Sequence, residues 1–231
     1  MHNPWDEDYH RGYEWWLMTE AKKRNPNIQL YGLSWAFPAH VSCAPGTLVN
    51  CTDNPYTYPQ QLATYITKWV AGAKNTYDLD IDFIGSWNER SYNTTYLKTL
   101  RATLDNNGFT NTKIVAPDSN WGIANDILND PELAAAIWGI GAHYPGVHSN
   151  AQAMQTGKQL WASEDDSTYS NSVGAACFAR IINQNFVQGN MTATINWNLI
   201  TSYMKGTNWY RAGIFNAFNP QSGMYIYLLM Y

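Results

Sequence analysis

The chain has 231 residues, of which 45% are hydrophobic and 14% are charged, so it can bury a sizeable core and is predicted to form one globular domain. Its net charge is −4 at pH 7 and it has no cluster of lysine and arginine, which argues against a nucleic-acid partner. No apolar run approaches the roughly 18 residues of a membrane span, and the acidic first residues lack the apolar core of a signal peptide.

The first half of the chain alternates helical and extended patterns. A helix is predicted at Asp8–Arg24, because its last turn is basic, and a strand at Asn27–Trp35. From Leu62 to Ala73, apolar residues recur with the spacing of one helix face. A strand at Asp80–Trp87 follows, and then a helix through Leu104.

The second half continues the same alternation. Helical stretches and extended apolar runs follow one another, bounded by turn residues. The predicted strands are Thr112–Ala116, Ala136–Ala142, Gln159–Ala162 and Thr192–Trp197, and the predicted helices are Ile123–Leu128, Pro131–Ala135 and Val173–Phe186.

Six alternations of strand and helix indicate an α/β fold with a parallel sheet and helices outside it. Polar or aromatic residues end several strands, as in (β/α)8 TIM barrels, where the strand ends converge on the catalytic face. A doubly wound sheet is the alternative, but no glycine-rich phosphate loop follows a strand. Because a closed barrel needs eight units, residues 1–231 are expected to be a catalytic barrel domain truncated at both ends, covering about strands 3 to 8.

The cysteines and the glycosylation sequons indicate the cellular compartment in which the protein is expected. Cys43 and Cys51 bracket a short loop rich in Pro, Gly and Asn, so a local disulfide is expected in an oxidising compartment, which leaves Cys177 without a mate. N-x-S/T sequons fit a secreted or lysosomal protein, and they lie at Asn50, Asn93 and Asn190. No His/Cys cluster has zinc-ligand spacing, so neither a metal nor a cofactor is predicted.

Two glutamates follow predicted strands and form the candidate catalytic pair. Glu89 comes directly after Asn88 at the end of an apolar run, and Glu164 closes another such run three strands later. Facing carboxylates at a barrel mouth suit cleavage of a glycosidic bond, with one carboxyl as proton donor and the other as attacking carboxylate. A retaining mechanism needs about 5 to 5.5 Å between them, and an inverting one about 6.5 to 9.5 Å.

Structural roles compete with catalysis at each acidic position. Glu89 has Arg90 beside it as an ion-pair partner. Asp165 and Asp166 compete with Glu164, but alternation along a strand lets only one of two adjacent side chains point inward. Asp118 is interpreted as a helix cap.

Seven segments occur in the order in which they appear in one family, and the likeness extends over nearly the whole chain, from about Asp6 to Tyr225. By these segments the chain resembles the galactocerebrosidase family of retaining β-glycosidases. They are RGYEWWLM (residues 11–18), AKKRNPNI (21–28), YGLSWAFP (31–38), IGSWNERSYN (84–93), IGAHYPG (140–146), LWASEDDST (160–168) and INWNLITSY (195–203).

The resemblance implies a role for each candidate residue. Glu89 matches the proton donor and Glu164 the nucleophile, while Asn88 would bond the sugar 2-hydroxyl. Trp35 and Trp197 match aromatic positions around the galactose. The implied substrate is a terminal β-galactose on a galactosylceramide-type glycolipid, with a lipid-presenting activator protein as a further partner and the lysosome, or secretion, as the destination.

Alternatives stay open beside this reading. The chain could be a glycan or glycolipid binder without turnover, or a related enzyme acting on glucosylceramide or galactan. The loop from Ala39 to Tyr58 departs from the family's usual run. Cys177 matches a family cysteine whose partner would lie beyond residue 231.

Overall fold

A computed structural model describes residues 5–167, 171–202, 215–219 and 224–226. The chain divides into two compact units, which are described separately. The first comprises residues 1–119 and 123–139, and the second comprises residues 120–122 and 140–231. Among the described residues, no helix is long and apolar enough to cross a membrane.

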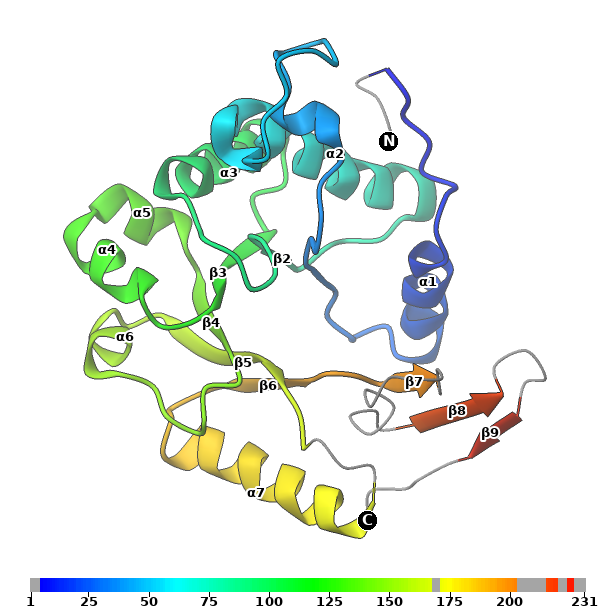
Figure 1. Cartoon of the computed structure of the whole chain (residues 1–231), viewed down its shortest axis with the longest axis vertical. Coiled ribbons are helices and arrows are strands. Elements are labelled where there is room, and N and C mark those ends of the chain that lie inside the picture. The colour runs from blue at the N-terminus through cyan, green and yellow to red at the C-terminus, as the bar shows by residue number, and fades with distance from the viewer. Residues whose placement is uncertain (1–4, 168–170, 203–214, 220–223, 227–231) are drawn as a thin grey trace. The chain divides into compact units, whose positions relative to one another are not determined.

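The first unit is a parallel sheet covered by helices (Figure 1). Its strands β1, β2 and β3 are neighbours in that order, with Tyr31 opposite Phe83 and Gly85 opposite Val115. The elements are α1 (Glu14–Arg24), β1 (Tyr31–Gly32), the 3-10 turns η1 (Ala39–Ser42) and η2 (Pro55–Thr57), α2 (Pro59–Tyr77), β2 (Phe83–Gly85), α3 (Thr94–Asn106), β3 (Lys113–Ser119), α4 (Ile123–Asn129) and α5 (Pro131–Ala136).

Local sequence signals explain the two long helices of this unit. Pro59 occupies the first turn of α2, where its missing N–H costs nothing, and Leu62, Ile66 and Val70 form its buried face. Asn93 caps α3 by accepting the N–H of Tyr96. The two helices lie side by side in Figure 1.

The second unit contains three further strands and a long helix. Strands β4, β5 and β6 are neighbours in that order, with β5 and β6 parallel, and α7 runs beside β6 (Figure 1). The elements are β4 (Gly139–His143), which starts at the boundary of the units, α6 (Ala151–Gln155), β5 (Gln159–Asp165), α7 (Ser172–Val187) and β6 (Ala193–Asn196). A separate sheet contains β7 (Ile200–Ser202), β8 (Phe215–Asn219) and β9 (Met224–Ile226).

The expected elements are present, but five of them are shorter than predicted, and the first helix and the first strand differ most. The helix predicted from Asp8 starts at Glu14, because Gly12 has φ +89° and Arg11 pairs with Asp8 instead of continuing a helix. The strand predicted at 27–35 keeps only its centre, and it begins after Leu30 because the Asp82 side chain accepts the Leu30 N–H. Helix α6 and the sheet β7–β9 were not predicted.

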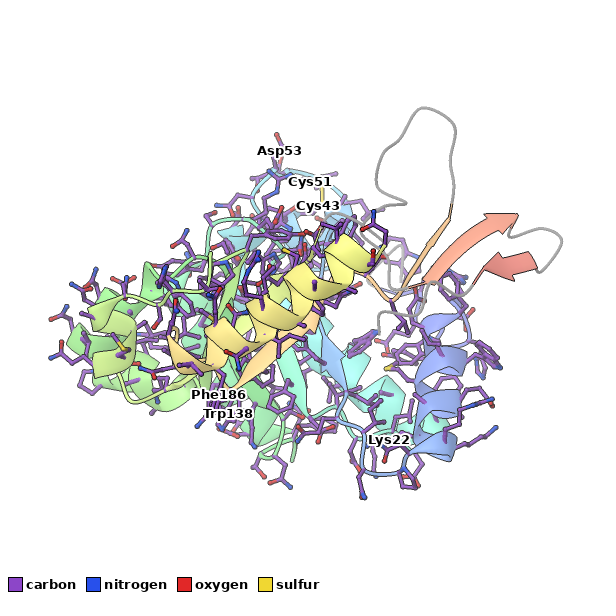
Figure 2. The ribbon with its side chains drawn as sticks, turned by 90° about the horizontal axis from the view of Figure 1, so that it is seen from below. Lys22, Cys43, Cys51, Asp53, Trp138 and Phe186 are labelled. Atoms are coloured by element: carbon purple, nitrogen blue, oxygen red, sulfur yellow. A yellow bond between two sulfur atoms is a disulfide. The ribbon has the colours of Figure 1, made fainter. Side chains whose placement is uncertain are left out.

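The expected disulfide joins Cys43 to Cys51 with an S–S distance of 2.00 Å. Figure 2 shows both cysteines beside Asp53 at the edge of the first unit. Cys43 is buried, and Cys51 is exposed. Among the described cysteines Cys177 is free, as predicted, and its thiol accepts a hydrogen bond from Arg180 at 3.4 Å.

Candidate active site

Glu89 lies on a tight turn that follows β2. The Glu89 backbone has φ +51°, and its N–H donates to the Asp118 carbonyl at 3.0 Å. Ser86 also donates its hydroxyl to the Pro117 carbonyl of β3 at 2.9 Å, while on the side of β1 the Asn88 N–H donates to the Ser34 carbonyl at 3.0 Å. These hydrogen bonds connect the turn to the chain at the ends of both neighbouring strands. Glu89 itself is exposed.

The side chains of Asn88 and Arg90, the two sequence neighbours of Glu89, differ in their contacts. The Arg90 guanidinium lies over the Trp87 ring, 6.0 Å from its centroid. The Asn88 side-chain oxygen is buried and has no hydrogen-bond partner in the described part of the chain. An unsatisfied buried oxygen favours a ligand that brings a donor, such as a sugar hydroxyl.

Asp118 is not a helix cap, so that interpretation was wrong. It belongs to β3 and is fully buried, and its carboxylate accepts the Tyr31 hydroxyl at 2.6 Å. The sequence suggested a cap because Asp is common before helices, and α4 begins five residues later. The Tyr31 partner lies 87 residues away in the chain, which no local pattern reveals.

Glu164 lies near the end of β5, and side chains from the end of β4 contact it. Tyr144 donates its hydroxyl to one carboxylate oxygen at 2.7 Å, and His143 Nδ1 lies 3.8 Å from the other. The Tyr144 N–H also bonds the Glu164 carbonyl at 2.8 Å. A phenol donated to this buried carboxylate stabilises negative charge on it. Neither Tyr144 nor His143 was singled out from the sequence.

Asp165 points away from Glu164's partners, as strand alternation predicts. Its carboxylate accepts a hydrogen bond from the buried Asn185 of α7 at 3.2 Å, and Asn185 also donates to Thr194 of β6. Burial raises the pKa of the Asp165 carboxyl, the nearby Asp166 charge raises it further, and bonds from Asn185 and the Asp166 N–H lower it. Asp165 therefore links β5, β6 and α7.

Replacing Asp165 with Asn should flatten part of the pH dependence of stability. A carboxyl whose pKa is raised on folding costs nothing below its ordinary value of 3.8, and it destabilises the native state as pH rises through the raised pKa. The free energy of unfolding of the variant should therefore increase relative to that of the parent as pH rises above 3.8. Urea unfolding from pH 3.5 to 7 measures this difference, and a difference that is constant with pH would contradict it.

The two predicted aromatic positions differ in their surroundings. Trp35 is 56% exposed, and its carbonyl accepts the Trp87 indole N–H at 3.2 Å. Trp197 follows β6, is half-buried, and donates its backbone N–H to the Asp165 carbonyl. Trp35 is therefore not a core residue, and both rings are accessible enough to meet a ligand.

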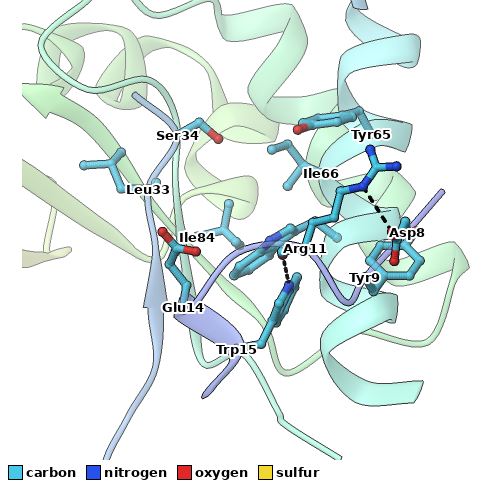
Figure 3. Close-up of a pocket in the computed structure, with 13 residues that line it drawn as sticks. Asp8, Tyr9, Arg11, Glu14, Trp15, Leu33, Ser34, Tyr65, Ile66 and Ile84 are labelled. Atoms are coloured by element: carbon cyan, nitrogen blue, oxygen red, sulfur yellow. Dashed lines mark hydrogen bonds and ion pairs between the residues drawn. The ribbon is translucent and has the colours of Figure 1, made fainter. Parts of the chain in front are cut away.

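Two hollows of the first unit lie away from the predicted residues. One cavity of about 320 Å³ is lined by Asp8, Arg11 and Glu14 together with residues of β1 and α2 (Figure 3). A mostly apolar one of about 530 Å³ lies between the disulfide loop and the start of α2. Neither is lined by Asn88 or Glu89.

The structure thus groups the predicted residues into two sets. Asn88 and Glu89 are held with Asp118 in the first unit, and Glu164 is held with Tyr144 in the second, where Trp197 bonds Asp165. The separation of about 5 to 5.5 Å between the two carboxylates that a retaining mechanism requires stays a prediction.

Comparison with known proteins decides the family. A sequence model described as glycosyl hydrolase family 59 matches residues 1–229. The chain belongs to this family. Galactocerebrosidase of Homo sapiens is 51% identical over 227 residues, covering 98% of this chain and 32% of the relative. That of Danio rerio is 50% identical over 226 residues, covering 98% and 33%, and a putative galactocerebrosidase of Caenorhabditis elegans is 34% identical over 203 residues, covering 87% and 30%.

The chain spans about a third of the length of these family 59 relatives. Among solved structures, SrfJ from Salmonella typhimurium matches with a TM-score of 0.70 at 18% identity, over 92% of this chain and 54% of that one. A GH30 endoxylanase from Clostridium papyrosolvens matches with a TM-score of 0.59 at 19% identity, over 81% and 55%. These likenesses confirm the predicted fold class, a partial (β/α)8 barrel.

Proposed function

We propose that this chain carries the catalytic residues of a retaining glycoside hydrolase that removes terminal β-galactose from galactosylceramide-type glycolipids. The observation that carries the proposal is that two glutamates lie at the ends of parallel strands, each held by its own hydrogen bonds, in a member of glycosyl hydrolase family 59. The galactose and the lipid of the proposed substrate are inferred from the name of the galactocerebrosidase relatives.

Two displacements at the anomeric carbon describe the proposed chemistry. Glu89 gives its proton to the glycosidic oxygen while the Glu164 carboxylate attacks the anomeric carbon, so the aglycone leaves as an alcohol and a galactosyl ester forms. Glu89, now a carboxylate, then takes a proton from water, whose oxygen attacks the same carbon and releases Glu164. Galactose leaves with its original β configuration.

The neighbouring groups have defined roles in this proposal. The unsatisfied Asn88 oxygen would accept a sugar hydroxyl, and a contact to the 2-hydroxyl strengthens as the transition state forms. Trp197 and the exposed Trp35 would offer rings to the apolar faces of the galactose. The Cys43–Cys51 disulfide supports an oxidising compartment, such as the lysosomal or secretory route.

The stereochemistry of the first product tests the proposal directly. The protein that carries residues 1–231 is incubated with an aryl β-galactoside, and the anomeric protons of the released galactose are followed by NMR before mutarotation. β-Galactose should appear first. Early α-galactose would contradict double displacement.

The strongest competing function is a glycan or glycolipid binder without turnover. The accessible tryptophans and the buried amide oxygen of Asn88 favour it, because binding needs these groups but not the carboxylates. Calorimetric titration with galactose beside the NMR assay separates the two functions, since binding without any galactose release supports the binder. Parallel assays with glucosylceramide and galactan test the two related substrates.

Replacing Tyr144 with Phe should lower kcat/KM by about 10-fold to 100-fold, because a hydrogen bond to a charged group contributes about 1.5–3 kcal/mol. The variant keeps the ring and loses only the hydroxyl that bonds Glu164. Tyr92→Phe is the matched control, since the Tyr92 hydroxyl bonds the Asp126 carboxylate at 2.7 Å. Equal effects of the two substitutions on aryl galactoside turnover would refute a special role for Tyr144.

A further inference from the structure

A hydrogen-bonded pair formed by the half-buried Tyr31 and the buried Asp118 is connected to the Glu89 turn. Tyr31 of β1 donates its hydroxyl to the carboxylate of Asp118 at the end of β3, and the O···O distance is 2.6 Å. The two strands that supply this pair are not neighbours, because β2 lies between them in the sheet. The pair therefore crosses over β2 near its end, which is where the chain turns toward Glu89.

Gly85, the last residue of β2, makes room for this crossing. A methyl group built on Gly85 would lie 2.3 Å from the Asp118 carboxylate and 2.5 Å from the Tyr31 hydroxyl. The Tyr31 and Asp118 side chains can meet over β2 in this arrangement only because β2 has no side chain at this position. Neither the tyrosine nor the aspartate could hold its present place above an alanine.

The backbone of Asp118 connects the pair to Glu89. Asp118 and Glu89 both have left-handed φ values, +60° and +51°, which residues other than glycine adopt rarely and only when their surroundings hold them. The Asp118 carbonyl accepts the Glu89 N–H at 3.0 Å. Contacts that hold the backbone conformation of Asp118 therefore also orient the backbone of Glu89, and with it the Glu89 side chain.

We infer that Asp118, anchored by Tyr31, is a positioning residue that aims the Glu89 carboxyl at the glycosidic oxygen. This inference rests on the proposed function, in which Glu89 is the proton donor. Asp118 is fully buried, so it acts through its carbonyl and not by touching substrate. Misplacing a catalytic group by about 1 Å can cost about 100-fold in rate.

Substrates with different leaving groups separate positioning from a general loss of structure. An alkyl galactoside needs the proton from Glu89, whereas 2,4-dinitrophenolate is stable enough to leave from a galactoside without one. In the protein carrying residues 1–231, Tyr31→Phe should lower kcat/KM for octyl β-galactoside by about 10-fold to 100-fold. It should change kcat/KM for 2,4-dinitrophenyl β-galactoside by less than about 3-fold, because that step does not use the donor.

Two further variants and a control complete the experiment. Gly85→Ala would push the Tyr31 and Asp118 side chains apart, so it should lower kcat/KM for the octyl galactoside more than for the dinitrophenyl galactoside. Asp118→Asn keeps an acceptor oxygen for Tyr31, so it should retain most of the activity that Asp118→Ala loses. Tyr77→Phe is the matched control, since it removes a hydroxyl that bonds the Tyr9 carbonyl in the same unit. Thermal unfolding of every variant shows how much structure is lost.

Each outcome decides for or against the inference. Equal losses on both substrates, with a lowered melting temperature, would assign Tyr31 and Asp118 to stability and overturn the positioning role. Activity of Tyr31→Phe equal to that of Tyr77→Phe would overturn it as well. Glu89→Ala separates failure of the proposed function from failure of the positioning inference. If Glu89→Ala does not lose more activity on the octyl than on the dinitrophenyl galactoside, Glu89 is not the proton donor and the proposed function fails. If Glu89→Ala shows this difference and the Tyr31 and Gly85 variants do not, only the positioning inference fails.

Discussion

Replacing Glu164 with Gly should lower kcat for an aryl β-galactoside by at least about 1,000-fold, because the variant has no carboxylate to form the galactosyl ester. The substitution also leaves a space beside the Tyr144 hydroxyl, which bonds Glu164 in the parent. Steady-state turnover in the protein that carries residues 1–231 measures the loss. Residual activity within about 10-fold of the parent would remove Glu164 from the mechanism.

Azide should rescue the Glu164→Gly variant and reveal the side of attack. The small anion can occupy the space of the lost carboxylate and attack the anomeric carbon once, so the product should be α-galactosyl azide, with inverted configuration. Asp165→Gly and Asp166→Gly are matched controls, since both carboxylates are adjacent in sequence and Asp165 bonds Asn185. Formation of the α-azide by either control would move the nucleophile to that residue.

The second large effect is expected at Glu89. Glu89→Ala should lower kcat/KM for an alkyl β-galactoside by about 100-fold to 10,000-fold, the usual contribution of general acid catalysis. A 2,4-dinitrophenyl galactoside should keep most of its kcat/KM, since its leaving group does not need the proton. Comparing kcat/KM across leaving groups of graded acidity measures this dependence.

Azide also distinguishes Glu89 from Glu164. The Glu89→Ala variant can still form the galactosyl ester with Glu164 but lacks the base that activates water, so azide should attack the ester and give β-galactosyl azide, with retained configuration. Arg90→Ala is the control for the neighbouring charge, because its guanidinium lies over Trp87. An α-azide from Glu89→Ala would exchange the two roles.

Sequence periodicity was sufficient where an element depends on its own residues. The apolar face from Leu62 to Ala73 predicted α2 because residues three and four apart share one side of a helix. The Cys43–Cys51 disulfide was equally local, since only eight positions separate the cysteines. In contrast, β1 begins later than predicted because the side chain of Asp82, 52 positions away, accepts the Leu30 N–H.

The sequence by itself determined the family, the alternation of strands and helices, and two glutamates as the predicted catalytic pair. It could do so because these depend on short segments, residue spacing and the residue types at strand ends. Only the tertiary structure decided that Asp118 is a buried partner of Tyr31 and not a cap, and that Tyr144 bonds Glu164. These contacts join residues 87 and 20 positions apart, and hydrogen bonds between distant residues form only when the packed sheet brings the strands together.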